Sequence, residues 1–233
     1  MHELTYQEKI LTEHCDPKKD LRLSSLLRLV QEASIRSVEE LGYPREKTLD
    51  RGILWVVGKQ RFEISRLPVY DEEVQVLTYP GKKMHFFFER HTFLSDKQGN
   101  PLVKCNAIWA LIDMNKRSIV NPSAYGIEIP EDHLEGELPF PAGFRMEKEG
   151  EEATIEAKWS DCDLNGHLNN AAYLDIVEDL IPIEFLKSHR CKAIDISYKK
   201  EIPLGEKVGL RYVYDAPFYY FESDHFSLRL EYE

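Results

Sequence analysis

The segment DCDLNGHLNNAAYLDIVE (161–178) repeats the pattern of HCDPKKDLRLSSLLRLVQ (14–31), which lies 147 positions earlier in the chain. Both segments contain a Cys-Asp turn that leads into a run with apolar residues at helical spacing. The matched pairs are Cys15 with Cys162, Asp16 with Asp163, Leu21 with Leu168, Leu27 with Leu174, Leu29 with Ile176, Val30 with Val177 and Gln31 with Glu178. Further on, ISRLP (64–68) matches KKEIP (199–203) at an offset of 135 positions. Two matches in the same order indicate a duplicated unit.

The secondary structure is expected to follow the same duplication. The first half is predicted to hold one long helix, 24–41, with apolar residues around most of its circumference and Gly42 as its stop. Its predicted strands are 3–12, 53–66, 72–80, 84–95 and 102–113. The elements predicted for the second half are a helix at 169–181 and strands at 152–159, 192–202, 206–214 and 225–232.

An apolar helix needs cover on most of its faces, and an antiparallel sheet that curls round it supplies that cover. We therefore expect an α+β chain of two such units, 1–125 and 151–233, joined by a turn-rich linker at 126–150. Because 215–224 reads as a loop, one strand alone fits after it, and the second sheet is expected to be one strand short. The edge left open would need cover from the linker, the first unit or the second subunit of a homodimer.

The composition narrows the class of protein. Hydrophobic residues make up 42% and charged residues 30% of the chain, which suits a packed protein rather than a disordered one. A net charge of −11 argues against non-specific nucleic-acid binding, and no run of about 18 apolar residues is present to span a membrane. The start of the chain lacks a signal-peptide pattern, so a cytoplasmic location is expected. The four scattered cysteines predict neither disulfides nor a metal site, and no cofactor is expected.

The two copies differ most around the turn before the helix. The replacements, from the first copy to the second, are Lys18 by Asn165, Asp20 by His167, Arg22 by Asn169 and Arg66 by Glu201. The second copy therefore gathers Asp163, Asn165, His167 and Glu201 around one helix start. An Asp or Asn in this place is commonly a helix cap, and a single His there is commonly structural. Their joint presence in one copy favours a catalytic interpretation.

The stretch SDCDLNGHLNNAAYLDIVEDLIP (160–182) resembles the D-x-N-x-H-x-N-N-x-x-Y signature of the plant and bacterial acyl-ACP thioesterase family. The stretches GILWVVGKQRFEISRLPVYDEEVQV (52–76) and KCNAIWALIDMNKRSIV (104–120) resemble its amino-terminal part. The resemblance implies a tandem (double) hot-dog fold, each unit a long central helix wrapped by an antiparallel sheet. It also implies an acyl-chain pocket in the first unit and catalytic positions at Asp163, Asn165, His167 and Glu201 in the second. The position after the glutamate, a cysteine in plant members, is Ile202 here.

The chemistry that this implies is hydrolysis of a fatty acyl-ACP thioester by activated water, without a covalent cysteine intermediate. Asn165 would donate an N–H to the thioester oxygen, aided by N–H groups at the helix start, and His167 would act as general base. Asp163 or Glu201 would orient the imidazole or hold the water. The alternatives left open are an acyl-CoA thioesterase, a hydratase or dehydratase of acyl thioesters, and a non-catalytic binding module.

An acidic acyl carrier protein would need a local basic face on a chain whose net charge is −11. The candidate residues are Lys187, Arg190, Lys192, Lys199 and Lys200. A solvated cluster without a partner is the alternative for these residues.

Overall fold

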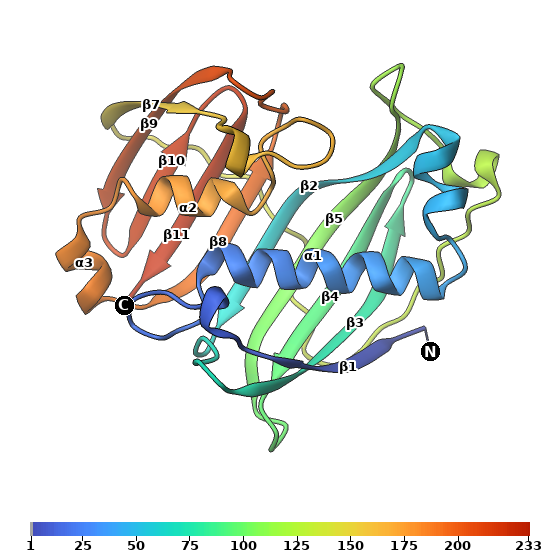
Figure 1. The fold of residues 1–233 in the computed structure, drawn as a ribbon, viewed down its shortest axis with the longest axis horizontal. Helices are drawn as coiled ribbons and strands as arrows, with labels where there is room; N and C mark the ends of the chain where they lie inside the picture. The colour runs from blue at the N-terminus through green and yellow to red at the C-terminus, as the bar shows by residue number, and fades with distance from the viewer. Residues whose placement is uncertain (1) are drawn as a thin grey trace.

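The computed structural model describes residues 2–233 as one continuous antiparallel sheet with its two main helices along one face (Figure 1). The first half holds β1 (Leu4–Lys9), α1 (Leu23–Glu40), β2 (Ile53–Ile64), β3 (Glu73–Met84), β4 (Phe87–Ser95), β5 (Pro101–Asp113) and the short β6 (Ser118–Ile119). The second half holds β7 (Glu151–Glu156), α2 (Ala172–Glu178), α3 (Ile183–Ser188), β8 (Cys191–Tyr198), β9 (Lys207–Asp215), β10 (Phe218–Glu222) and β11 (Phe226–Tyr232). No helix within residues 2–233 has the length and apolar character needed to cross a membrane.

The two halves join edge to edge through their sheets. The strand order is β1-β3-β4-β5-β2-β8-β11-β10-β9-β7, and β6 pairs with β5. The joint is the antiparallel pair of β2 with β8, in which Arg61 lies opposite Asp195. Because each half covers one edge of the other, the outer edges of the shared sheet are β1 and β7.

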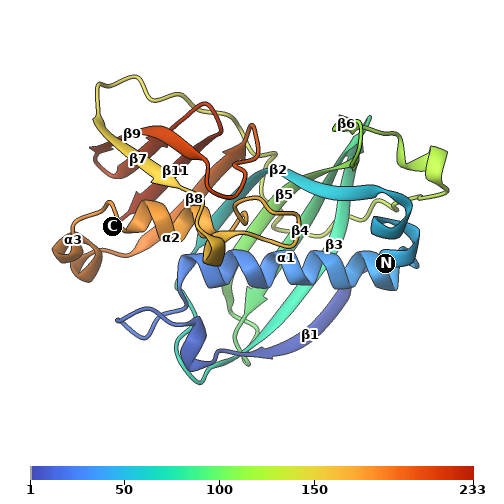
Figure 2. The same cartoon turned by 45° about the horizontal axis from the view of Figure 1, so that its top comes forward.

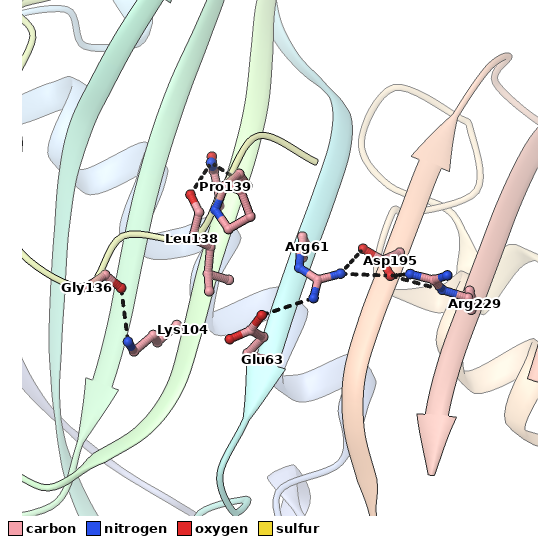
Figure 3. Close-up of polar contacts among 9 residues, drawn as sticks. Arg61, Glu63, Lys104, Gly136, Leu138, Pro139, Asp195 and Arg229 are labelled. Carbon is pink, nitrogen blue, oxygen red and sulfur yellow. Dashed lines mark hydrogen bonds and ion pairs between the residues drawn. The ribbon is translucent and has the colours of Figure 1, made fainter. Parts of the chain in front are cut away.

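Charged side chains link the joint on the face away from the helices (Figure 3). Asp195 of β8 accepts hydrogen bonds from Arg61 of β2 at 2.9 Å and from Arg229 of β11 at 2.5 Å. The linker crosses the first half on this face, where the Asn106 amide donates to the Leu138 carbonyl and Lys104 to the Gly136 carbonyl. A buried acid shared by two guanidinium groups ties three strands from both halves together.

Helix α1 runs across the first half of the sheet, and α2 follows beyond its amino-terminal end (Figure 2). The buried side chains of α1 are Leu23, Ser24, Ser25, Leu26, Leu27, Val30, Ala33, Ser34 and Ser37. Ile35 is 45% exposed and Val38 is half-buried, and both line a cavity instead of the core. The apolar residues around most of the helix circumference therefore serve two purposes, since some pack in the core and others face the cavity. Gly42 does end the helix as predicted, with a φ of +87° that suits glycine.

The second helix is much shorter than the predicted span of 169–181. Its helical turns cover Ala172–Glu178, and Pro182 precedes the separate helix α3. Asn169 delays the start, because its side-chain oxygen accepts the backbone N–H of Ala171 at 2.9 Å in a local turn. A long central helix is consequently present in the first half alone.

The strand that we expected to be missing is present. Residues 218–222 form β10, which pairs with β9 on one side and β11 on the other. Ala216 and Pro217 supply the turn, and the aromatic run that follows favours an extended strand, with Tyr219 and Phe221 buried. Apart from β6, each half therefore has five strands, and the prediction of a shorter second sheet was wrong. The open edge that suggested a homodimer does not arise in this way.

Candidate active site

A cavity of about 990 Å³ lies where the two halves meet, bounded by α1, β2, β4, β5 and the turn before α2. The wall from the first half is largely apolar and includes Ile35, Val38, Leu54, Trp55, Val57, Phe88, Ile108, Trp109, Ala110 and Ile112. The wall from the second half is largely polar and includes Asp163, Asn165, His167, Asn169, Asn170, Lys199, Lys200 and Glu201. One cavity thus joins an apolar space of ligand size to a group of reactive side chains.

The structure brings the four sequence-predicted residues together at this wall. Asp163, Asn165 and His167 lie on the turn before α2, and Glu201 lies beyond the end of β8. His167 Nε2 is 3.5 Å from Glu201 Oε2. The His167 side chain is 23% exposed and the Glu201 side chain is 39% exposed. Each side chain can therefore contact water in addition to its partner.

Asp163 organises the turn itself. Its Oδ1 accepts the backbone N–H groups of Asn165 at 2.8 Å and His167 at 3.4 Å. In the first copy, Asp16 Oδ1 accepts the N–H groups of the residues two and four positions further on, at 2.8 and 3.1 Å. The first copy thus has an equivalent of Asp163, although the position that matches His167 is Asp20 there. These contacts of Asp163 are explained by turn geometry alone.

In each copy the turn before the helix is matched with a segment that follows a strand, β2 in the first copy and β8 in the second. The two copies carry different charges at these positions. In the second copy an imidazole, His167, faces a carboxylate, Glu201. At the matching positions the first copy has a carboxylate, Asp20, and a guanidinium, Arg66. Burial raises the pKa of Asp20, and the charge of Arg66 opposes that rise. Arg66 is bound to Glu72 at 2.6 Å, so the matching pair of positions in the first copy holds a carboxylate and a guanidinium in place of an imidazole and a carboxylate.

The Asn165 amide points along the same turn. Its Nδ2 donates to Asp163 Oδ2 at 3.3 Å, which leaves the second hydrogen of this NH₂ group for a substrate oxygen. The N–H groups at the helix start, which we expected to aid Asn165, belong to a short helix, because α2 has only seven residues and begins at Ala172.

Two contacts that the sequence did not indicate come from the first half. Arg117, in the turn between β5 and β6, contacts Glu201 Oε2 through Nη2. Gln60 of β2 lies 3.2 Å from the Tyr198 hydroxyl, which also lies 3.0 Å from the Asn170 carbonyl. Each contact spans the two halves, so neither a comparison of the copies nor a short motif could reveal it.

Comparison with known families gives this geometry a context. Residues 3–123 match the acyl-ACP thioesterase N-terminal domain, and residues 145–226 match the acyl-ACP thioesterase C-terminal domain. The chain belongs to the acyl-ACP thioesterase family. The family resemblance predicted from 160–182 is therefore confirmed.

Solved structures of the family share the fold. An acyl-ACP thioesterase from Bacteroides thetaiotaomicron aligns with a TM-score of 0.85 at 21% identity, over 100% of this chain and 98% of that chain. The 12:0-ACP thioesterase from Umbellularia californica gives a TM-score of 0.82 at 17% identity, again over 100% and 98%. The α+β double hot-dog prediction is confirmed, apart from the length of the second helix.

Curated relatives are similar over most of this chain. An acyl-[acyl-carrier-protein] hydrolase of Cuphea viscosissima is 22% identical over 195 residues, which is 77% of this chain and 47% of that protein. The oleoyl-acyl carrier protein thioesterase 2 of Arabidopsis thaliana is 22% identical over 224 residues, or 84% and 59%. The chain spans about half the length of the curated relatives that it matches.

In the part of the chain that the structure describes, the polar wall of the cavity has no thiol. Among residues 2–233 no cysteine lines the cavity. Burial raises the pKa of the Cys191 thiol far above its ordinary value, and Ile202 is fully buried in the core. No cluster of three or more His, Cys, Asp or Glu side chains in the described part of the chain is arranged to hold a metal ion.

The five basic residues suggested for carrier docking do not form one face. Lys199 and Lys200 line the cavity beside Glu201. Lys187, Arg190 and Lys192 lie around α3 and the start of β8, at the opposite end of that strand (Figure 1). An eight-residue strand separates the two groups by roughly 25 Å at about 3.3 Å per residue.

Proposed function

We propose that this chain hydrolyses fatty acyl-ACP thioesters, releasing the free fatty acid and the carrier protein. The observation that carries the proposal is the His167–Glu201 pair at the polar end of a cavity whose other wall is apolar. Membership of the acyl-ACP thioesterase family, and relatives named as acyl-ACP hydrolases, support an acyl-ACP as the substrate.

In the proposed reaction His167 takes a proton from a water molecule, which attacks the thioester carbon. Glu201, 3.5 Å from His167 Nε2, stabilises the imidazolium that forms. Asn165 donates its free N–H to the developing oxyanion. When the tetrahedral intermediate collapses, the C–S bond breaks and the thiolate takes the proton from His167. Asp163 keeps Asn165 and His167 in place through its hydrogen bonds to the turn.

The alternative functions would require different groups at this site. An acyl-CoA thioesterase would use the same side chains and differ only in the surface that receives the thiol carrier. A hydratase or dehydratase has no need of an amide donor at Asn165, and a binding module has no need of a base beside a carboxylate. A cytoplasmic location and a homodimer stay predictions from the sequence.

The decisive assay presents the purified chain with a series of acyl-ACPs and the matching acyl-CoAs and identifies the products. We expect free fatty acid and free thiol, with acyl-ACP the better substrate. An enoyl or hydroxyacyl thioester as the product would identify a hydratase or dehydratase instead. Binding without turnover would identify a binding module.

The proposed base is tested by His167→Ala, which we expect to lower kcat by about 10²–10⁴-fold while the protein stays folded. Loss of the Asn165 donor in Asn165→Ala should cost about 10²–10³-fold. The matched control is Asp20→Ala, at the same position of the first copy, which should leave kcat unchanged. Cys191→Ser should also be nearly silent. Near-normal turnover by the His167→Ala protein would rule out this mechanism.

A further inference from the structure

Arg90 of β4 places a charged group inside the apolar part of the cavity. Its side chain is on the helix side of the sheet, where Nη1 donates to Ser37 Oγ of α1 at 2.8 Å. The residue is only 5% exposed, and it lines the cavity together with Val38, Phe88 and Trp109. The bond to Ser37 is the one hydrogen bond that the Arg90 side chain makes within residues 2–233. A single hydroxyl is therefore the acceptor for a guanidinium that has five N–H donors.

No carboxylate balances this guanidinium. Within residues 2–233 no Asp or Glu oxygen lies within the 4.0 Å of an ion pair with Arg90. Burial lowers its pKa to about 10, so it stays charged at neutral pH. A buried charge without a partner is among the most costly features that a fold can carry. In the free protein, water inside the cavity can hydrate it, but a plain alkyl chain that reaches Arg90 would expel that water and offer nothing in return.

The strand register places Arg90 away from the turn 163–167, which holds the proposed catalytic residues Asp163, Asn165 and His167. Arg90 lies opposite Ala107 of β5, and Ala107 lies opposite Gln60 of β2. Two strand spacings of about 4.8 Å therefore put Arg90 roughly 10 Å from Gln60. Gln60 is the residue that contacts Tyr198 beside the catalytic turn. A ligand held at the thioester end by His167 would thus meet Arg90 along the remote part of its acyl chain.

We propose that the cavity selects acyl chains that carry an oxygen acceptor on their remote part, as a hydroxyl, oxo or carboxylate group, and that Arg90 binds this oxygen. The inference rests on the proposed function for the ligand being an acyl thioester. The acceptor replaces the cavity water at the guanidinium, and a hydrogen bond to a charged group discriminates strongly against a ligand that lacks it. Arg90 is then a specificity-determining residue and takes no part in the hydrolysis itself.

A binding experiment tests the inference without any need for turnover. Free fatty acids with an oxygen at the far end of the chain (ω-hydroxy and ω-carboxy acids) are compared by calorimetry with plain acids of the same length. We expect the oxygen-bearing acids to bind about 10–100-fold more tightly, as for a hydrogen bond to a charged group. Arg90→Met should abolish that preference, and Arg90→Lys should restore part of it. Equal affinities in the wild-type protein across a range of chain lengths would overturn the proposal.

Turnover and stability supply independent outcomes. With the matching acyl-ACPs, Arg90→Met should lower kcat/KM for oxygen-bearing chains and raise it for plain chains, whereas Phe88→Leu, on the same strand face, should change both alike. Arg90→Met should also raise Tm of the free protein, because it removes an unbalanced buried charge. If Arg90→Met only lengthens the preferred plain chain, Arg90 is a stop for alkyl chains and the inference is wrong. Absence of hydrolysis with the binding preference intact would instead contradict the proposed function alone.

Discussion

Glu201 is contacted from both halves, by His167 of its own half and by Arg117 of the other. A carboxylate that shares one oxygen between an imidazole and a guanidinium has little freedom to rotate. Arg117 has a φ of +52° in its tight turn, which fixes the direction in which its side chain leaves the backbone. The first half therefore contacts the polar wall of the cavity through Arg117, a residue outside the D-x-N-x-H pattern.

We expect Arg117→Met to lower kcat about tenfold to a hundredfold, because a misplaced Glu201 no longer holds the imidazole in line. KM should change less, and Arg117→Lys should recover part of the activity. The control is Arg28→Met, which removes another ion pair between the halves, Arg28 to Asp175 at 3.2 Å, away from the cavity. Equal losses in the two variants, accompanied by a lower Tm, would show that Arg117 only stabilises the fold.

At this scale the sequence predicted what lies within one short motif. The substitution of His167 for Asp20 drew attention to a turn that lines the cavity, because both residues occupy the same position of a duplicated element. The same comparison does not distinguish a catalytic from a structural role for Asp163, since Asp16 makes the same turn hydrogen bonds in the first copy. Arg117 and Gln60 could not be found, because their partners lie in the other half and nothing local marks them.

Helix α2 ends at Glu178, whose carboxyl group is buried and lies near other carboxylates. Burial, together with the nearby carboxylates of Asp175 and Asp16, raises the pKa of Glu178 to about 8. Within the folded protein the group therefore keeps its proton at pH values where the unfolded chain, with an ordinary value of 4.5, has already released it. The unfolded state binds fewer protons in that window, so stability is greatest below the ordinary value and falls as the pH rises towards 8.

Replacement of this carboxyl group by an amide, in Glu178→Gln, should remove that loss. We expect Tm of the variant to exceed that of the wild-type protein by several degrees at pH 8, given about 2–4 °C per kcal/mol in a chain of this size. The difference should shrink as the pH falls towards 4.5. Asp179→Asn, at the exposed next position, is the control and should show no such dependence. A constant difference between wild type and Glu178→Gln at all pH values would contradict the assignment.

The two elements that were predicted wrongly failed for different reasons. The span 169–181 has helical spacing throughout, but Asn169 and Pro182 form turns at its ends, and local turn bonds outweigh periodicity over so few residues. The segment 215–224 reads as a loop in the sequence, but its residues 218–222 form β10. Their strand becomes evident only from its two neighbours, β9 and β11, which a single segment of sequence does not reveal.

Over the whole molecule, the two halves supply different walls of the cavity, and the pairing of β2 with β8 holds these walls together. The first half supplies the apolar wall, Arg90 and Arg117, and the second supplies the polar turn. The shared sheet, pinned by Asp195 between Arg61 and Arg229, fixes the distance between them. If the proposed function holds, an acidic carrier must bring its acyl thioester to the polar wall of a protein whose net charge is −11, so the position of basic residues matters more than their number.

Lys199 and Lys200 are the basic candidates at that wall, whereas Lys187 and Lys192 lie at the far end of β8. If the carrier docks beside the cavity, Lys199→Glu with Lys200→Glu should raise KM for acyl-ACP by about tenfold and change KM for acyl-CoA much less. The same reversal at Lys187 and Lys192 preserves the change in net charge and should have little effect on either substrate. Added salt should weaken the wild-type preference for acyl-ACP and narrow the difference between the two double variants, since exposed charges are screened. Initial rates over a range of substrate and salt concentrations measure both effects. Equal losses from the two reversals would mean that overall charge, and not a docking site beside Glu201, governs the encounter with the carrier.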